Sequence, residues 1–120
     1  MNDITVTQVR LVNQKNLDED GRISTVSLMS WIYETAVITA MQSCGCKVVV
    51  RTSDHHDFCH NLSDCSFLEI TGRPVHAGES SMEIQVDLFA ENPGHKKVLI
   101  TRSYLTVEAV DNQMHPVRIA

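Results

Sequence analysis

Glu34 is the residue of this chain whose setting points most directly to chemistry. It is the only Asp, Glu, Lys, Arg or His between Arg22 and Lys47. The surrounding stretch lacks proline, and its apolar side chains are spread around almost the whole circumference, which predicts a buried helix. A carboxylate buried there must be paired, neutralised or used. Two alternatives to catalysis stay open: a satisfied core carboxylate, and a carboxylate that reaches solvent at a subunit boundary.

A second candidate is the tract from His55 to His60, which reads His-His-Asp-Phe-Cys-His. His56 and Cys59 are separated by two residues, and His56 and His60 are four apart, as in many zinc ligand pairs. A structural zinc site shows two such pairs, whereas this sequence has one tract. We therefore expect no bound metal here and interpret the tract as a solvated loop or an interface segment, with a metal-binding regulatory module as the competing hypothesis.

The cysteines are Cys44, Cys46, Cys59 and Cys65. Because the N-terminus lacks the features of a signal peptide, we expect a cytoplasmic protein with reduced, structural thiols. Gly45 lies between the first two cysteines where the predicted helix stops, a position that favours a left-handed glycine.

Composition limits the class of protein. The chain has 120 residues, 42% of them hydrophobic and 21% charged, which predicts a single globular domain over residues 1–120. The net charge of −5 argues against nucleic acid as a partner, because that role needs a basic face. No run of residues approaches the roughly 18 apolar residues of a membrane span, so no membrane partner is expected.

The hydrophobic pattern predicts one long helix and five strands. The helix is expected at residues 24–44, the strands at residues 4–12, 47–52, 67 onward, 82–88 and 98–110, and a hairpin at residues 92–95. Pro74 suggests an edge or a bend in the third strand, and the tail after Asp111 is expected to be loose. One sheet face cannot hide a helix that is apolar all round. The sheet must wrap around it or a second chain must cover it, so we expect an oligomer.

Several segments resemble acyl-CoA thioesterases. Residues 21–36, which read Gly-Arg-Ile-Ser-Thr-Val-Ser-Leu-Met-Ser-Trp-Ile-Tyr-Glu-Thr-Ala, are similar to the loop-to-helix signature of that family, nearest to its cytosolic acetyl-CoA hydrolase branch. The Asp-Phe pair at 57–58, the Ser-Ser-Met-Glu-Ile run at 80–84 and the strand at 104–111 also match. The resemblance, which spans residues 16–111, implies an α+β hotdog fold, in which an antiparallel sheet wraps around one long central helix.

The sequence departs from the family at its catalytic positions. Arg22 stands where the family has an amide or an acid, and Thr25-Val26 replaces a Gly-Gly pair at the helix entrance. Tyr33 occupies the position of the helix aspartate that is catalytic in many members, and Glu34 follows it.

The resemblance implies a hydrolase that binds acyl-CoA or CoA and uses water as nucleophile, with no cofactor and no metal. Glu34 and Asp57 are the candidate catalytic residues. N–H groups at a helix entrance and in a turn can hold a carbonyl or phosphate oxygen. The candidate substrate-binding residues are therefore Ser24, Thr25, Val26, Ser27, Ser80 and Ser81. A plain N-cap is the alternative for Ser24. The competing function is a catalytically silent hotdog protein that keeps the fold and self-associates, as a dimer or a larger assembly up to a hexamer.

Overall fold

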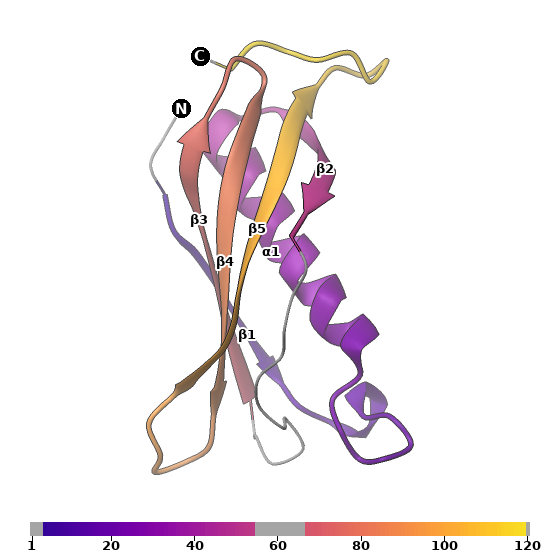
Figure 1. Cartoon of the computed structure of the whole chain (residues 1–120), viewed down its shortest axis with the longest axis vertical. Helices are drawn as coiled ribbons and strands as arrows, with labels where there is room; N and C mark the ends of the chain where they lie inside the picture. The colour runs from indigo at the N-terminus through magenta and orange to yellow at the C-terminus, as the bar shows by residue number, and fades with distance from the viewer. Residues whose placement is uncertain (1–3, 55–66, 120) are drawn as a thin grey trace.

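The computed structural model describes residues 4–54 and 67–119, which form one antiparallel sheet and one long helix (Figure 1). In chain order the elements are β1 (Val6–Leu11), a short 3-10 turn η1 (Gln14–Asn16), α1 (Thr25–Cys44), β2 (Lys47–Ser53), β3 (Phe67–Ala77), β4 (Ser81–Glu91) and β5 (Val98–Val110). The predicted order of strand, helix and four further strands is confirmed.

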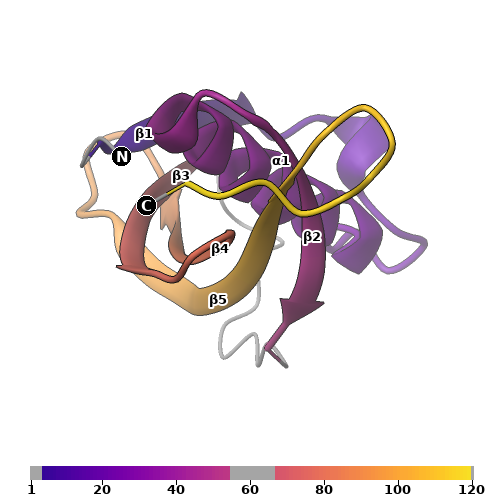
Figure 2. The ribbon, with the colours of Figure 1, turned by 90° about the horizontal axis from the view of Figure 1, so that it is seen from above.

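The strands lie in the order β1-β3-β4-β5-β2, and every neighbouring pair is antiparallel. The two strands that flank α1 in sequence, β1 and β2, are thus the two edges of the sheet in the described part of the chain. Seen from above, the sheet curls around one side of α1 (Figure 2). Among the described residues, the outer edges of β1 and β2 have no neighbouring strand, and a second chain can add there.

The core lies between the concave face of the sheet and one face of α1. Along β4, the predicted alternation is confirmed: Met82, Ile84, Val86 and Leu88 are each at most 2% exposed. On the helix, the buried apolar side chains are Leu28, Ile32, Ala36 and Ala40, four residues apart as one helix face requires. Burying each large aliphatic side chain contributes about 1.5–3 kcal/mol.

The helix ends follow from local sequence. Ser24 precedes the first turn in an extended conformation, and its hydroxyl oxygen accepts a hydrogen bond from the Ser27 N–H. Gly45 ends the helix in the left-handed region, at φ 69° and ψ 21°, and its N–H donates to the Met41 carbonyl at 2.8 Å. The predicted left-handed glycine at the helix end is confirmed. Glycine is favoured there because a residue with a Cβ is strained at that φ.

The prediction that α1 is buried all round is wrong for the single chain. Its apolar residues Val26 and Met41 are 78% and 45% exposed. The sheet contacts one face of the helix only, so apolar side chains on the opposite face stay at the surface. The burial pattern along α1 is that of a one-sided helix, although its sequence is apolar on both sides.

Three hydroxyl residues run along the buried face of α1 at every fourth position. Thr35 donates to the Trp31 carbonyl, Thr39 to the Thr35 carbonyl and Ser43 to the Thr39 carbonyl, at 2.6–2.8 Å. These bonds satisfy hydroxyls that would otherwise be costly in a core. The stripe faces Gly72 of β3, where an added Cβ would collide with the Thr39 side chain. Helix and sheet approach this closely because position 72 has no side chain.

Two further expectations concern Pro74 and the tail of the chain. β1 pairs with β3 only as far as Gly72, so Pro74 lies beyond that pairing, at a local edge of the described sheet, and the register of β3 with β4 shifts after Pro74. The tail after Asp111 is not loose. The Val117 N–H donates to the Ala109 carbonyl at 2.9 Å, and the Ile119 N–H to the Glu79 carbonyl at 2.7 Å.

Candidate functional site

The Glu34 carboxylate is at the surface, not in the core. Its side chain is 45% exposed, and its Oε1 lies 2.6 Å from Nη2 of Arg10 in an ion pair. Gln8 Nε2 donates to the same oxygen at 3.4 Å. The predicted burial is therefore wrong, because position 34 lies on the flank of α1 that faces the edge strand β1. Arg10 and Gln8 point toward the helix from that strand.

A chain of hydrogen bonds extends this contact into the core. The Thr35 hydroxyl, which belongs to the buried stripe, also lies 2.9 Å from Gln8 Oε1, so its one proton is shared between that oxygen and the Trp31 carbonyl. Arg10, Glu34, Gln8 and Thr35 thus connect β1 to α1 through side chains alone. An ion pair as exposed as this one contributes about 0–1 kcal/mol to stability. The network orients Glu34, which is held by two donors and still open to solvent.

Tyr33, the neighbour of Glu34, lies on the opposite flank of the helix. Its hydroxyl oxygen is 2.9 Å from Oγ of Ser53, the last residue of β2. Successive helix residues are rotated by about 100°, which is why the two side chains reach opposite edges of the sheet. Two hydroxyls bonded to each other use one proton between them, so the second proton is available to a further acceptor. The flank of α1 that faces β2, called the β2 flank below, therefore offers a neutral hydroxyl donor from Tyr33 or Ser53.

The helix entrance presents backbone donors next to an exposed apolar side chain. Helix geometry leaves the N–H groups of Thr25 and Val26 without an acceptor within α1, and this end of the helix carries a partial positive charge. Both residues are exposed, Val26 at 78%. The N-cap interpretation of Ser24 is confirmed by its bond to Ser27. Capping occupies the Ser27 N–H and leaves the first two N–H groups for a ligand oxygen.

The Ser80–Ser81 turn connects β3 to β4 and is tied to β5. The Ser80 hydroxyl donates to Glu108 Oε2 at 3.1 Å, and its carbonyl accepts from the Ala109 N–H at 2.8 Å. The Ser81 carbonyl accepts from the Gly78 N–H at 2.8 Å. These bonds fix the turn.

The helix entrance and this turn lie at opposite ends of the molecule. Ser81 is paired with Glu108, and Glu108 with Val49, close to where β2 begins after the C-terminal end of α1. Ser24 marks the other end of a 20-residue helix, which is about 30 Å long. Figure 1 shows the same separation. One chain alone does not bring the two predicted CoA contacts together.

An acid closes the loop before α1, and the remaining sequence candidates lie outside the described residues. Asp18 Oδ1 accepts from the Asp20 and Arg22 N–H groups at 2.9 and 3.1 Å, which closes the loop before α1. Asp57 and the tract at residues 55–60 lie outside the described residues. Within residues 4–54 and 67–119, no three His, Cys, Asp or Glu side chains gather as metal ligands would.

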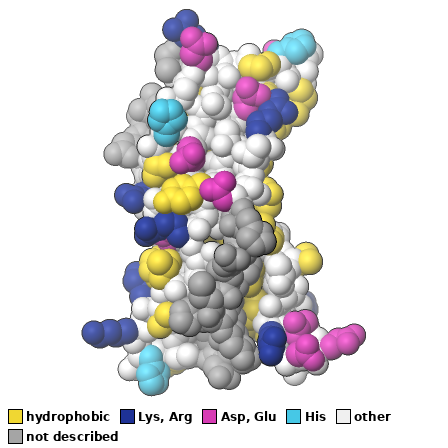
Figure 3. Space-filling model, in the orientation of Figure 1, with side chains coloured by type: hydrophobic (Ala, Val, Ile, Leu, Met, Phe, Trp, Pro, Cys, Tyr) yellow, Lys and Arg dark blue, Asp and Glu magenta, His cyan; other side chains and the backbone are white. Residues whose placement is uncertain are grey.

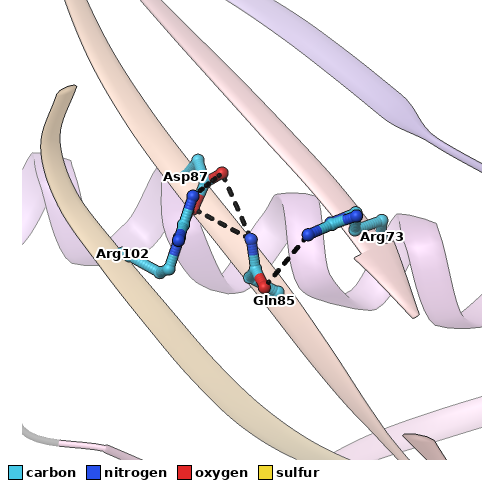
Figure 4. A network of polar contacts seen from close by, with 4 residues as sticks. All are labelled: Arg73, Gln85, Asp87 and Arg102. Atoms are coloured by element: carbon cyan, nitrogen blue, oxygen red, sulfur yellow. Dashed lines mark hydrogen bonds and ion pairs between the residues drawn. The ribbon is translucent and has the colours of Figure 1, made fainter. Parts of the chain in front are cut away.

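The outer face of the sheet, which points away from α1, carries a polar network that the sequence did not predict. Arg102 binds both carboxylate oxygens of Asp87, at 2.8 and 3.2 Å, and Gln85 joins Asp87 to Arg73 (Figure 4). The hydrogen bond and negative charge of Asp87 raise the pKa of the Arg102 guanidinium. Gln85 is only 5% exposed although it faces away from α1. The polar alternation of β4 places these residues on the outer face, but their partners come from other strands.

Figure 3 shows that acidic and basic side chains intermingle on this face. Three ion pairs lie there: Arg102 with Asp87, Lys97 with Glu69 and Arg51 with Glu108. Among the described residues, the outer face thus carries charges of both signs close together. In the described part of the chain, no helix has the length and apolar character needed to cross a membrane.

Solved structures with a similar fold are acyl-CoA thioesterases. A hexameric acyl-CoA thioesterase is 31% identical, with a TM-score of 0.90, and the match covers 96% of this chain and 74% of that one. An acyl-CoA hydrolase from Staphylococcus aureus, solved with butyryl-CoA, CoA and CoA disulfide, is 29% identical, with a TM-score of 0.89, and the match covers 96% and 71% of the two chains. The expected hotdog fold is thus confirmed.

The sequence is also 29% identical over 91 residues to mouse acyl-coenzyme A thioesterase 11. That match covers 76% of this chain but spans only 15% of the length of the mouse protein. Residues 20–96, more than half of the chain, match the family model of the thioesterase superfamily. The chain therefore belongs to the thioesterase superfamily.

Proposed function

We propose that this protein binds acyl-CoA and hydrolyses the thioester to a free acid and CoA, with water as the nucleophile. The observation that carries the proposal is the exposed entrance of α1 in a chain of this superfamily. The N–H groups of Thr25 and Val26 point out of the helix end, where they can hold an oxygen that becomes negative during the reaction. The butyryl-CoA and CoA bound to the Staphylococcus aureus relative support the ligand class.

The residues at the entrance also limit the substrate. The exposed Val26 side chain occupies space beside the N–H groups, so a thioester must approach past it. A bulky group next to the carbonyl carbon is disfavoured there. The attacking water needs a base, and the carboxylates we propose for it are Glu34 and Asp57.

Self-association would complete the proposed site. Two copies joined through the free edge of β2 around a twofold axis would run antiparallel, since an isologous pairing repeats the same contact in reverse. The entrance of one helix, near Ser24, would then approach the end of the partner that carries the Ser80–Ser81 turn. We propose a dimer as the smallest functional unit, and the hexameric relative supports a larger assembly of such dimers.

A second function, acyl-CoA binding without hydrolysis, is favoured by one specific observation. The carboxylate of Glu34 is ion-paired with Arg10 on the β1 flank of α1. The β2 flank presents the hydroxyls of Tyr33 and Ser53 instead of an acid. A site on that flank has hydroxyl donors for a carbonyl oxygen, but α1 contributes no carboxylate to it, since Glu34 lies on the other flank.

The test compares Glu34→Gln with a matched control, Arg10→Gln. Both changes break the same ion pair, so both should lower stability by no more than about 1 kcal/mol. Only the first removes the proposed base, and it should lower kcat by about 10²–10⁴-fold while CoA affinity stays similar. Hydrolysis is followed by chromatography of released CoA, because a disulfide dye would react with the protein's own cysteines.

The outcomes separate the candidate functions. CoA binding by calorimetry together with no hydrolysis by the unchanged protein would establish the second function. Normal rates in both variants would show that Glu34 is structural, and the base would then be Asp57 or an acid from the loop at residues 18–20 of a partner chain. No heat and no thermal shift at millimolar CoA would refute both functions.

A further inference from the structure

The junction between α1 and β2 is a Cys-Gly-Cys turn. Cys44 is the last residue of α1, Gly45 caps it in the left-handed region, and β2 begins at Lys47, directly after Cys46. The Gly45 N–H binds the Met41 carbonyl, which fixes the turn against the helix. Both cysteines are free thiols and half-buried, so each is partly open to solvent.

The turn brings the sulfur atom of each cysteine close to the backbone of the other. Sγ of Cys44 is 4.0 Å from the Cys46 carbonyl oxygen, and Sγ of Cys46 is 3.5 Å from the Cys44 carbonyl oxygen. A fully extended chain separates the first and third Cα atoms by about 7 Å. The left-handed conformation of Gly45, at φ 69° and ψ 21°, bends the chain at this point and so shortens the span toward the range of about 4.4–6.8 Å that disulfides require.

We propose that Cys44 and Cys46 form an oxidisable dithiol that closes to an intramolecular disulfide by exchange with a small-molecule disulfide. The proposal does not rest on acyl-CoA hydrolysis, because the dithiol uses neither the helix entrance nor any carboxylate. It lies at the opposite end of α1 from Thr25.

The exchange proceeds in two balanced steps. The Cys46 thiolate attacks one sulfur of the small disulfide, which forms a mixed disulfide and expels one small thiolate. The Cys44 thiolate then attacks the Cys46 sulfur and expels the second small thiolate. Two protein thiols are oxidised, one small disulfide is reduced, and the two released thiolates take up the protons. Burial raises the pKa of the Cys44 thiol, so Cys44 is the resolving residue and not the first nucleophile.

The closed disulfide would change the position of β2, the edge strand that follows the turn. It links the last residue of α1 to the residue before β2, so it constrains the direction in which β2 leaves the helix. Gly45 can adjust its φ and ψ angles when the disulfide closes, because glycine has a wider range of allowed backbone angles than other residues. Since β2 is a free edge in the described chain, oxidation at this turn would alter the strand that the proposed dimer uses.

Peptide mapping tests the proposal on the folded chain of 120 residues. The protein is incubated with oxidised glutathione, its free thiols are blocked with iodoacetamide, and it is digested with trypsin. Cleavage after Arg22 and Lys47 gives one peptide, residues 23–47, that contains both cysteines of the turn. Cys59 and Cys65 fall in the peptide of residues 52–96, because trypsin does not cut between Arg73 and Pro74.

The expected product is the peptide of residues 23–47 lighter by two hydrogen atoms and without any iodoacetamide label. In a Cys44→Ser variant the resolving thiol is absent, so the same peptide should carry glutathione on Cys46. The proposal fails if the wild-type peptide keeps two labelled thiols, carries two glutathiones, or is linked to the peptide of residues 52–96.

Discussion

Replacing Gly72 by alanine should destabilise the protein through a single crowded contact. A Cβ at this position would overlap Oγ1 of Thr39, and it would lie 3.0 Å from Cγ2 and 3.4 Å from the carbonyl oxygen of Thr35. The Thr39 hydroxyl cannot simply rotate away, because it donates to the Thr35 carbonyl inside a closed core. Inserting one methyl into such a site costs about 1–3 kcal/mol.

A double-mutant cycle identifies the cause of that loss. Thr39→Ala removes the overlapping oxygen, so Gly72→Ala should cost less by about 1 kcal/mol or more in that background. Thr39→Val is the matched control, since it keeps a branched side chain and should give no relief. Unfolding by urea with a constant m-value gives each free energy. If Gly72→Ala costs the same in all three backgrounds, the close approach of β3 to α1 does not set the stability of this region.

Three other predictions rest on separate features. Ser103 has a fully buried hydroxyl without a hydrogen-bond partner among the described residues, so Ser103→Ala should leave the free energy of unfolding unchanged or raise it by about 1 kcal/mol; a loss above that would reveal a hidden partner. Light scattering at micromolar concentration should give at least the mass of two chains, and a monomer mass would rule out the proposed dimer. His56→Ala and Cys59→Ala should leave the melting temperature nearly unchanged, whereas a large fall that a chelator reproduces would indicate a bound metal.

The elements could be predicted because their patterns are periodic and local. The alternation at residues 82–88 and the capping residues Ser24 and Gly45 each specify structure within a few positions. The ordered tail after Asp111 could not be predicted from the sequence. Its hydrogen bonds join the backbone N–H groups of Val117 and Ile119 to carbonyls elsewhere in the chain, and such bonds need no particular side chains. Gly72 carried a weak signal, since a glycine inside a strand often marks a close backbone approach.

The position of Glu34 was not predictable from helix pattern alone. Periodicity identifies a buried face only when the other face is polar, and α1 places apolar residues such as Val26 and Met41 on its exposed side. The hydrophobic pattern of α1 therefore does not indicate which face of the helix the sheet covers. The ion pair with Arg10 depends on the pairing of β1 with β3, a contact between residues about 60 positions apart.

Because Tyr33 and Glu34 lie on opposite flanks of α1, the choice of catalytic base depends on which edge of the sheet forms the dimer. A second chain at the free edge of β2 would cover the flank that carries Tyr33 and Ser53, and it would leave Glu34 beside β1. Hydrolysis that depends on Glu34 then requires the thioester to lie on the β1 flank, away from that interface or against a partner paired at β1. Hydrolysis at a β2 interface instead requires a base from outside α1. Mapping the paired edge and measuring Glu34→Gln must therefore give consistent answers, because each flank permits only one of the two mechanisms.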